Sequence, residues 1–128
     1  MGYYNSDLSE FIGKQCKKTM TSIDVDILQI KSSRNILRFI ESKHTNEKIG
    51  DQQGKALRTL AWIAKIVNKN PVLFNGKKIE VYLVRGDKPY EKIDVYNFLT
   101  FKSYRLEDIE KIKSFLEVEY DLTDQDLI

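Results

Sequence analysis

The residues best suited to contacting another molecule are four cations and the only tryptophan, which recur at helical spacing between residues 51 and 70. An α-helix turns about 100° per residue, and on that wheel these five fall on one side, opposite a broad apolar stripe. An indole among cations suits stacking on a nucleobase beside a phosphate, and Trp and Arg are enriched at protein-interface hot spots. We therefore predict a partner-binding face, unless another segment of the chain covers the indole. It consists of Lys55, Arg58, Trp62, Lys65 and Lys69.

Tyrosines and lysines also interleave in the strand-like segments that follow. A sheet face that carries both could form a second nucleic-acid platform. The alternative is ordinary cross-strand packing of tyrosines on a half-exposed surface. This predicted secondary surface consists of Lys78, Tyr82, Lys92 and Tyr96.

Signatures of catalysis are sparse. The chain has one histidine, His44, and one cysteine, Cys16, and nothing in the sequence brings the two together. Nucleophilic catalysis needs a base beside its nucleophile, and zinc needs a set of His and Cys ligands. The six glycines are scattered and form no phosphate-binding loop. The sequence thus predicts no catalytic residue, no bound metal and no cofactor, and it favours a protein that is not an enzyme.

A small metal-dependent nuclease stays open as an alternative. Such an enzyme needs clustered carboxylates with a lysine on adjacent strands. The strand-like region offers a candidate set, although outward charged pairs are ordinary on an antiparallel sheet. The set consists of Glu80, Glu91, Lys92 and Asp94.

Charge is unevenly distributed along the chain. Residues 117–128 hold five acids and no Lys or Arg, so the other 116 residues carry 21 cations against 14 acids, a net charge of +7. A basic body with an acidic end favours an anionic partner or a tail that folds back on the basic face. A third possibility is self-assembly, in which one subunit's basic face takes the acidic tail of the next.

The length of 128 residues suits one domain spanning 1–128, with residues 118–128 as a short strand or a loose acidic tail. No apolar run approaches the roughly 18 residues that cross a membrane. The first residues lack the basic start and apolar core of a secretory signal. A single cysteine fits a reducing compartment. We expect a cytoplasmic protein with no membrane partner.

Hydrophobic periodicity gives the elements that must position these residues. We expect helices over residues 7–20, 34–44, 51–70 and 105–117, and strands over residues 23–30, 72–74, 77–84 and 90–96. Asn75-Gly76 readily takes the positive φ angles of a hairpin turn between two of these strands. The predicted fold is α+β, in the order α-β-α-α-β-β-β-α. A small antiparallel, hairpin-based meander of three or four strands has about four helices packed on one face.

The function that these observations favour is a non-enzymatic binding module that engages a protein or a nucleic acid through the basic Trp62 face. A small accessory or inhibitor protein of a phage or another mobile element would suit this compact, basic chain. The alternatives are a self-assembling structural protein, which would be a homo-oligomer, and the small metal-dependent nuclease.

Overall fold

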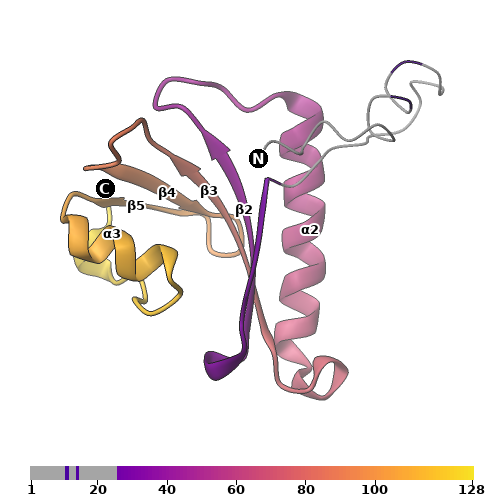
Figure 1. Ribbon diagram of the computed structural model, residues 1–128. Coiled ribbons are helices and arrows are strands. Elements are labelled where there is room, and N and C mark those ends of the chain that lie inside the picture. The colour runs from indigo at the N-terminus through magenta and orange to yellow at the C-terminus, as the bar shows by residue number, and fades with distance from the viewer. Residues whose placement is uncertain (1–10, 12–13, 15–25) are drawn as a thin grey trace.

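The computed structural model describes residues 11, 14 and 26–128, which form a five-stranded mixed sheet with one α-helix on each face (Figure 1). The strands are β1 (Ile27–Lys31), β2 (Ile36–Lys43), β3 (Lys78–Arg85), β4 (Ile93–Asn97) and β5 (Lys102–Leu106). The helices are α2 (Asp51–Lys69) and α3 (Ile109–Leu116), and the 3₁₀ turns are η1 (Ser32–Arg34), η2 (Pro71–Phe74) and η3 (Asp124–Asp126). The helix expected over residues 7–20 lies outside the described residues, apart from positions 11 and 14.

The strands lie in the order β1-β2-β3-β4-β5. The pair β2–β3 runs parallel, and the other three pairs run antiparallel. A parallel pair needs a long crossover connection, and α2 provides it. Strand β3 is consequently covered on both faces and is buried at six consecutive positions. The carboxyl ends of β2 and β3 meet at one edge of the sheet, beside the start of α2 (Figure 1).

Helix α2 covers one face of the sheet and agrees with the helix predicted over 51–70. Its small and branched apolar residues Leu57, Ala61 and Ala64 are buried in one cluster with inward side chains of β3. Near its end, the Asn68 side chain exchanges two 2.8 Å hydrogen bonds with the backbone of Ile79. The helix stops at Lys69, just before the sequence reaches a proline. Because this face is packed so closely, the opposite side of α2 is left to solvent.

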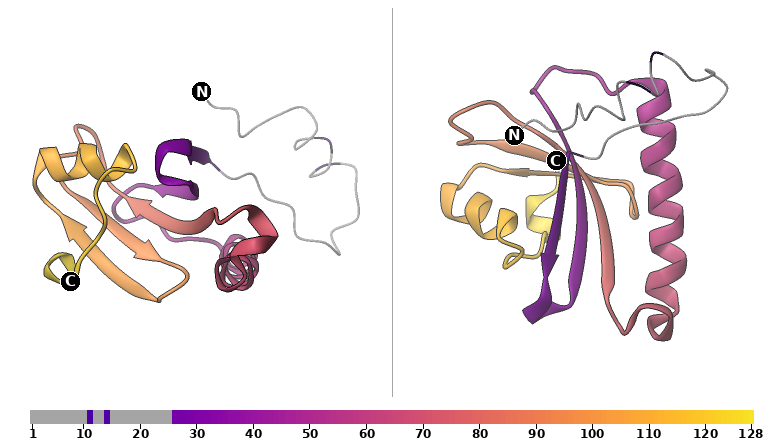
Figure 2. Two further views of the ribbon diagram at one scale, coloured as in Figure 1. Left: turned by 90° about the horizontal axis from the view of Figure 1, so that it is seen from below. Right: turned by 45° about the vertical axis from the view of Figure 1, so that its right-hand side comes forward.

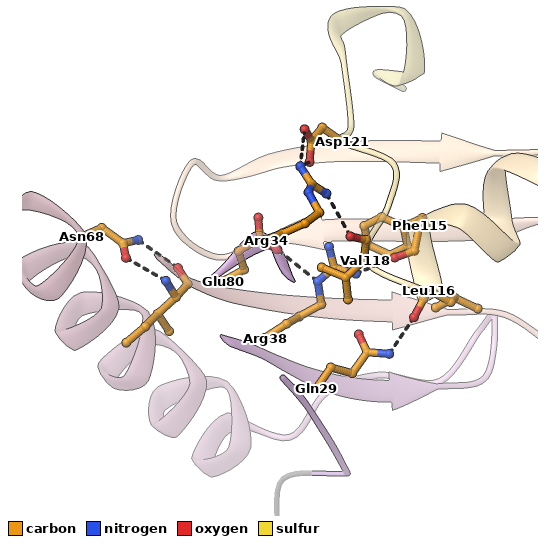
Figure 3. Close-up of polar contacts among 10 residues, drawn as sticks. Gln29, Arg34, Arg38, Asn68, Glu80, Phe115, Leu116, Val118 and Asp121 are labelled. Atoms are coloured by element: carbon orange, nitrogen blue, oxygen red, sulfur yellow. Dashed lines mark hydrogen bonds and ion pairs between the residues drawn. The ribbon is translucent and has the colours of Figure 1, made fainter. Parts of the chain in front are cut away.

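Helix α3 covers the other face, and side chains from β1, β2 and the turn between them fix its carboxyl end (Figure 3). The last carbonyls of a helix have no partner within it. Here Arg38 donates to Phe115 O at 2.6 Å, Gln29 to Leu116 O at 2.7 Å and Arg34 to Val118 O at 2.9 Å. Two guanidinium groups also favour the negative end of the helix dipole. These contacts explain how an eight-residue helix is held on the sheet.

The acidic C-terminal segment folds back on the β5 side of the molecule. Ile128 N donates to Ser103 O at 3.1 Å, and Leu127 forms a bridge with Tyr104. The Asp126 carboxylate is buried and accepts from Tyr120 Oη at 2.7 Å and from Thr123 N at 3.0 Å. The segment therefore packs against β5 and α3, away from the exposed side of α2 (Figure 2).

The helix predicted over 34–44 is wrong, because these residues form β2. The segment ILRFIESK places apolar side chains on both faces, a pattern that suits a strand buried inside a parallel pair as well as a helix. Pairing with β1 on one side and with β3 along all eight residues on the other decides the outcome. The change from helix to strand alters which side chains lie together, because side chains two residues apart share a face of a strand.

The predicted hairpin at Asn75-Gly76 is also wrong. Both residues take positive φ, 52° and 73°, but they connect the 3₁₀ turn η2 to β3. The helix expected from 105 begins at Ile109, since Lys102–Leu106 forms β5. The described chain therefore has two α-helices and a five-stranded mixed sheet, not about four helices on a three- or four-stranded antiparallel sheet. Within this part of the chain, no helix is long and apolar enough to cross a membrane.

Candidate active site

The predicted Trp62 face lies on the outer side of α2. The indole is 70% exposed, Lys55, Arg58 and Lys69 are exposed, and Lys65 is half-buried. None of the four cations forms an ion pair with a residue that the structure describes. A hollow of about 270 Å³ opens beside the indole, lined by Arg58, Ala61, Trp62, Lys65, Phe98 and Phe101. The five predicted residues thus share one face, and no described segment covers the tryptophan.

The predicted secondary surface is not assembled. Tyr82 is 5% exposed and lies beneath α3, with its ring edge-on to Phe115 at 5.4 Å between centroids. Tyr96 is on the opposite face of the sheet, where it packs edge-on to Phe98 at 5.0 Å. Lys78 and Lys92 are exposed at separate places. The two tyrosines therefore pack in the core on different faces and form no shared platform.

The carboxylates proposed for a nuclease do not converge either. Glu80 is buried on the α3 face, where its Oε1 accepts from Arg38 Nε at 3.0 Å. Asp94 points to the other face and holds Arg105 through two hydrogen bonds of 2.7 and 3.0 Å. Glu91 and Lys92 are exposed in the approach to β4. This set cannot act together on one substrate atom.

A different pair of carboxylates does come together, at the carboxyl end of β2. In the antiparallel pair β1–β2, Ile27 lies opposite Ile40, so the register brings Asp26 beside Glu41. The Asp26 carboxylate accepts from Ser42 N at 2.9 Å, which fixes it against the end of β2. Lys43 follows Glu41 by two residues and shares its face of the strand. Asp26, Glu41 and Lys43 therefore form one cluster on the face that α2 covers.

Glu41 is the unusual member of this cluster. It is 2% exposed, and its Oε2 accepts from Gln53 Nε2 in the first turns of α2 at 2.5 Å. Its Oε1 is buried and has no hydrogen-bond partner among the described residues. Burial, together with the neighbouring Asp26 carboxylate, raises the pKa of Glu41 to about 7. A buried acceptor without a donor, beside a second carboxylate, is expensive unless a proton shared between the two carboxylates or a cation completes the site.

Lys43 is the charge that partly compensates these acids. Its Nζ lies 3.9 Å from Glu41 Oε2 and 3.5 Å from Glu47 Oε2, and its side chain is 15% exposed. The Lys43–Glu41 distance is too long for a hydrogen bond, so the ammonium lies beside the carboxylate without capping it. Lys43 thus lies between the carboxylates of Glu41 and Glu47.

The donor set fits a hard divalent cation. Carboxylate oxygens are the ligands that Mg²⁺ prefers, and Mg²⁺ usually takes only one or two of them, completing its shell with water and substrate phosphate. No cluster of three or more His, Cys, Asp or Glu side chains able to hold a metal ion occurs in the described part of the chain. The described residues therefore build no closed, all-protein metal cage, and the Asp26–Glu41 pair would need water or a substrate phosphate to complete the shell of a cation.

The place of the cluster in the fold also suits a ligand. Ligands bind beyond the carboxyl ends of parallel strands, where the chain leaves the sheet. The turn after β3 is tied to this edge: Gly86 N donates to Lys43 O at 3.0 Å, and the Asp87 carboxylate accepts from Thr45 Oγ1 at 2.6 Å and lies 2.8 Å from His44 Nδ1. His44, the only histidine, is thus an exposed neighbour of the cluster that pairs with Asp87.

Sequence reasoning missed this cluster because residues 34–44 were expected to be helical. On a helix, Glu41 and Lys43 would point about 200° apart. The signal that could have found the site is an acid-x-Lys spacing at the end of an apolar strand, with an acid in the strand before it. Glu41-Ser42-Lys43 after Asp26 has that pattern.

Comparisons with known proteins add no family and no fold relative: the chain matches no protein-family model, no curated protein and no solved structure.

Proposed function

We propose that this protein is a small metal-dependent nuclease that hydrolyses phosphodiester bonds at the Asp26–Glu41–Lys43 cluster. The observation that carries the proposal is the buried Glu41 Oε1, which has no donor among the described residues and lies in a site shared with a second carboxylate. A protein keeps such a group at a cost to its stability, and strained or unpaired groups gather at functional sites.

The side chains divide into ligands and an electrostatic partner. Asp26 and Glu41 would hold a divalent cation through their carboxylate oxygens. When bound, Mg²⁺ would polarise a phosphoryl oxygen through its positive charge and lower the pKa of a bound water. The Lys43 ammonium would face the phosphoryl group and stabilise negative charge that develops there, as pre-positioned cations do in phosphoryl transfer.

Gln53 is a positioning residue in this account. Its amide donates to Glu41 Oε2, so Oε1 is the oxygen of this carboxylate that has no hydrogen-bond partner among the described residues. Partners of this kind orient a ligating carboxylate without touching the metal. They also explain why a half-buried glutamine in the first turn of α2 lies against a glutamate.

Nucleic acid is the substrate class that the charge distribution favours. Residues 1–116 carry a net charge of +7, and the cations of the α2 outer face have no acidic partner among the described residues. Cations that neutralise phosphates supply most of the affinity for a nucleic-acid backbone. A protein that meets phosphodiesters and holds a carboxylate–lysine cluster has the parts that hydrolysis requires.

The test is cleavage of an end-labelled DNA strand by the purified protein with Mg²⁺ or Mn²⁺. We expect cleavage to need the cation and to fall by at least roughly 100-fold in Glu41→Gln, Asp26→Asn and Lys43→Ala. Glu91→Gln is the matched control, because it removes an exposed carboxylate outside the cluster, and we expect it to cut like the wild type. Equal cleavage by Glu41→Gln and wild type would exclude this active site.

A second candidate function is the binding module predicted from the sequence, and the 70% exposed indole of Trp62 favours it. In this version the protein would cover a protein or nucleic-acid partner without cutting it. The same assay separates the two functions. A chain that binds a partner through Trp62, and whose Asp26 and Glu41 variants behave like the wild type in every assay, is a binding module only.

A further inference from the structure

We infer that the hollow beside Trp62 is a subsite for an unpaired nucleobase of the strand that the cluster cuts. The inference rests on the proposed nuclease function and adds that the substrate is single-stranded at this position. Three aromatic side chains line the hollow, and two of them are exposed: Trp62 of α2 and Phe101 of the β4–β5 connection, whereas Phe98 is buried. Trp62 and Phe101 are 70% and 62% exposed, so their rings meet solvent.

The β4–β5 connection is built to present Phe101 beside α2. In both Figure 1 and Figure 2 the connection reaches toward the middle of α2. Asn97 braces it, since its Oδ1 accepts from Leu99 N at 2.8 Å and its carbonyl accepts from Phe101 N at 2.8 Å. Phe101 itself takes φ of +63°, a region that bulky residues rarely adopt. This backbone conformation leaves a large apolar ring 62% exposed, with the Lys65 side chain as its neighbour on α2.

Charge identifies the occupant as part of a nucleic acid. Arg58 and Lys65 line the hollow together with the aromatic rings, and no carboxylate lines it. The Lys65 ammonium lies 4.5 Å from the centre of the Phe101 ring. Aromatic rings bind bases by stacking, while adjacent cations bind the phosphates on either side of the base. At about 270 Å³ the hollow is below the roughly 300–1,000 Å³ of small-molecule pockets, so it suits one ring system of a longer ligand.

The geometry relates this subsite to the cluster. Gln53 and Trp62 are nine residues apart on α2, which is roughly 14 Å along the helix axis. The cluster lies at the β1–β2 side of the sheet, and the hollow lies at the β4–β5 connection. A strand that occupies both would cross the outer side of α2, where Lys55 and Arg58 are exposed.

The experiment uses Trp62 as its own probe, because it is the only tryptophan in the chain. Oligothymidylate of roughly 12 nucleotides is titrated in EDTA, so that no strand is cut, and the intrinsic fluorescence is followed. We expect saturable quenching. Anisotropy of a labelled strand should show binding weakened roughly 5- to 150-fold in Trp62→Ala and in Phe101→Ala, the range for loss of one base–aromatic stack.

Controls separate stacking from general attraction. Leu73→Ala removes another exposed apolar side chain, and Lys113→Ala removes an exposed cation on α3, on the other face of the sheet. Both should bind like the wild type. Trp62→Ala should lower the affinity for a duplex of the same sequence by less than about twofold, because the bases of a duplex are not free to stack on the indole.

Three results would overturn the inference. One is a strand that binds without changing Trp62 fluorescence, and another is equal affinity of Trp62→Ala and wild type. The third is fluorescence that changes with protein concentration alone, which would assign the hollow to a second copy of the chain. Because this experiment measures no cleavage, a negative result would not contradict the proposed nuclease cluster. Equally, a cluster without cleavage activity would not contradict a base-binding subsite beside Trp62.

Discussion

Two buried glutamates on neighbouring parallel strands differ in how completely their carboxylates are paired. Glu80 on β3 lies directly across from Arg38 on β2 and accepts from its guanidinium at 3.0 Å. Arg38 is 1% exposed and also donates to Phe115 O, with its guanidinium 4.5 Å from the Phe115 ring centre. Glu41, on the other face of β2, has an amide on one oxygen and no partner among the described residues on the other.

We interpret this difference as separating a charge that stabilises the fold from a charge that is available to a ligand. A buried ion pair whose guanidinium also donates to a helix carbonyl holds two elements together, here the sheet and α3 (Figure 3). A buried carboxylate beside another carboxylate weakens the fold unless a cation joins them. The Arg38–Glu80 pair is therefore structural, and the Asp26–Glu41 pair is the functional candidate.

The largest expected effect comes from removing the structural charge. Arg38→Ala leaves Glu80 buried without its cation and α3 without a donor to Phe115 O, so we expect the free energy of unfolding to fall by about 3–5 kcal/mol. Urea denaturation followed by far-ultraviolet circular dichroism measures it. A loss below about 1 kcal/mol would mean that the pair does not hold α3 on the sheet.

A smaller change, an increase in the free energy of unfolding, should follow from neutralising Glu41, the glutamate of the proposed site. The pKa of Glu41 is raised from 4.5 to about 7, so the folded state favours its protonated form. The stability that this proton gives is fully present below pH 4.5 and is lost as the pH rises through 7. In EDTA at pH 8, Glu41→Gln should therefore be more stable than wild type by about 1–3 kcal/mol, with little difference at pH 5.

The comparison sharpens when Glu80→Gln is measured beside it. This variant leaves the Arg38 guanidinium without its carboxylate, so it should lower the free energy of unfolding at both pH values. If Glu41→Gln destabilised the protein as much as Glu80→Gln at pH 8, both glutamates would be structural and the contrast would disappear.

The smallest effect is expected at Gln53. Gln53→Ala removes the amide that orients Glu41 but leaves both carboxylates, so the unfolding free energy should change by less than about 1 kcal/mol. Cation affinity and cleavage should fall by about 10- to 100-fold, the usual consequence of losing a partner of a metal ligand. Asn68→Ala, which changes an amide elsewhere on α2, should lower stability through its bonds to Ile79 while leaving cation affinity unchanged.

The sequence predicted the parts of the molecule whose patterns are local. The α2 stripe, the position of Trp62 on its outer side and the alternating strand at Lys78–Arg85 all depend on neighbours within a few residues. The candidate active site depends on long-range pairing instead. Asp26 meets Glu41 only through the β1–β2 register, and β2 is a strand because β3 pairs with its full length.

Pairing partners also account for the other missed features. Tyr82 could have faced solvent or core, and only the docking of α3 buries it. The sequence alone predicts that Glu80 is an exposed acid, because nothing local shows that Arg38 lies across from it on a parallel strand. An apolar segment with a polar residue every few positions is compatible with a helix or a buried strand, so periodicity alone could not decide between them.

The most direct test of the account is calorimetric titration of the protein with Mn²⁺, which accepts the same oxygen ligands as Mg²⁺. At pH 8 we expect one saturable cation site in the wild type and in Glu91→Gln. Mn²⁺ binding at this site should be lost in Glu41→Gln and in Asp26→Asn. In the wild type, the Mn²⁺ affinity should weaken below pH 7 as Glu41 takes up a proton. Equal Mn²⁺ affinity in wild type and Asp26→Asn, or no binding by the wild type up to millimolar Mn²⁺, would contradict the assignment of this cluster.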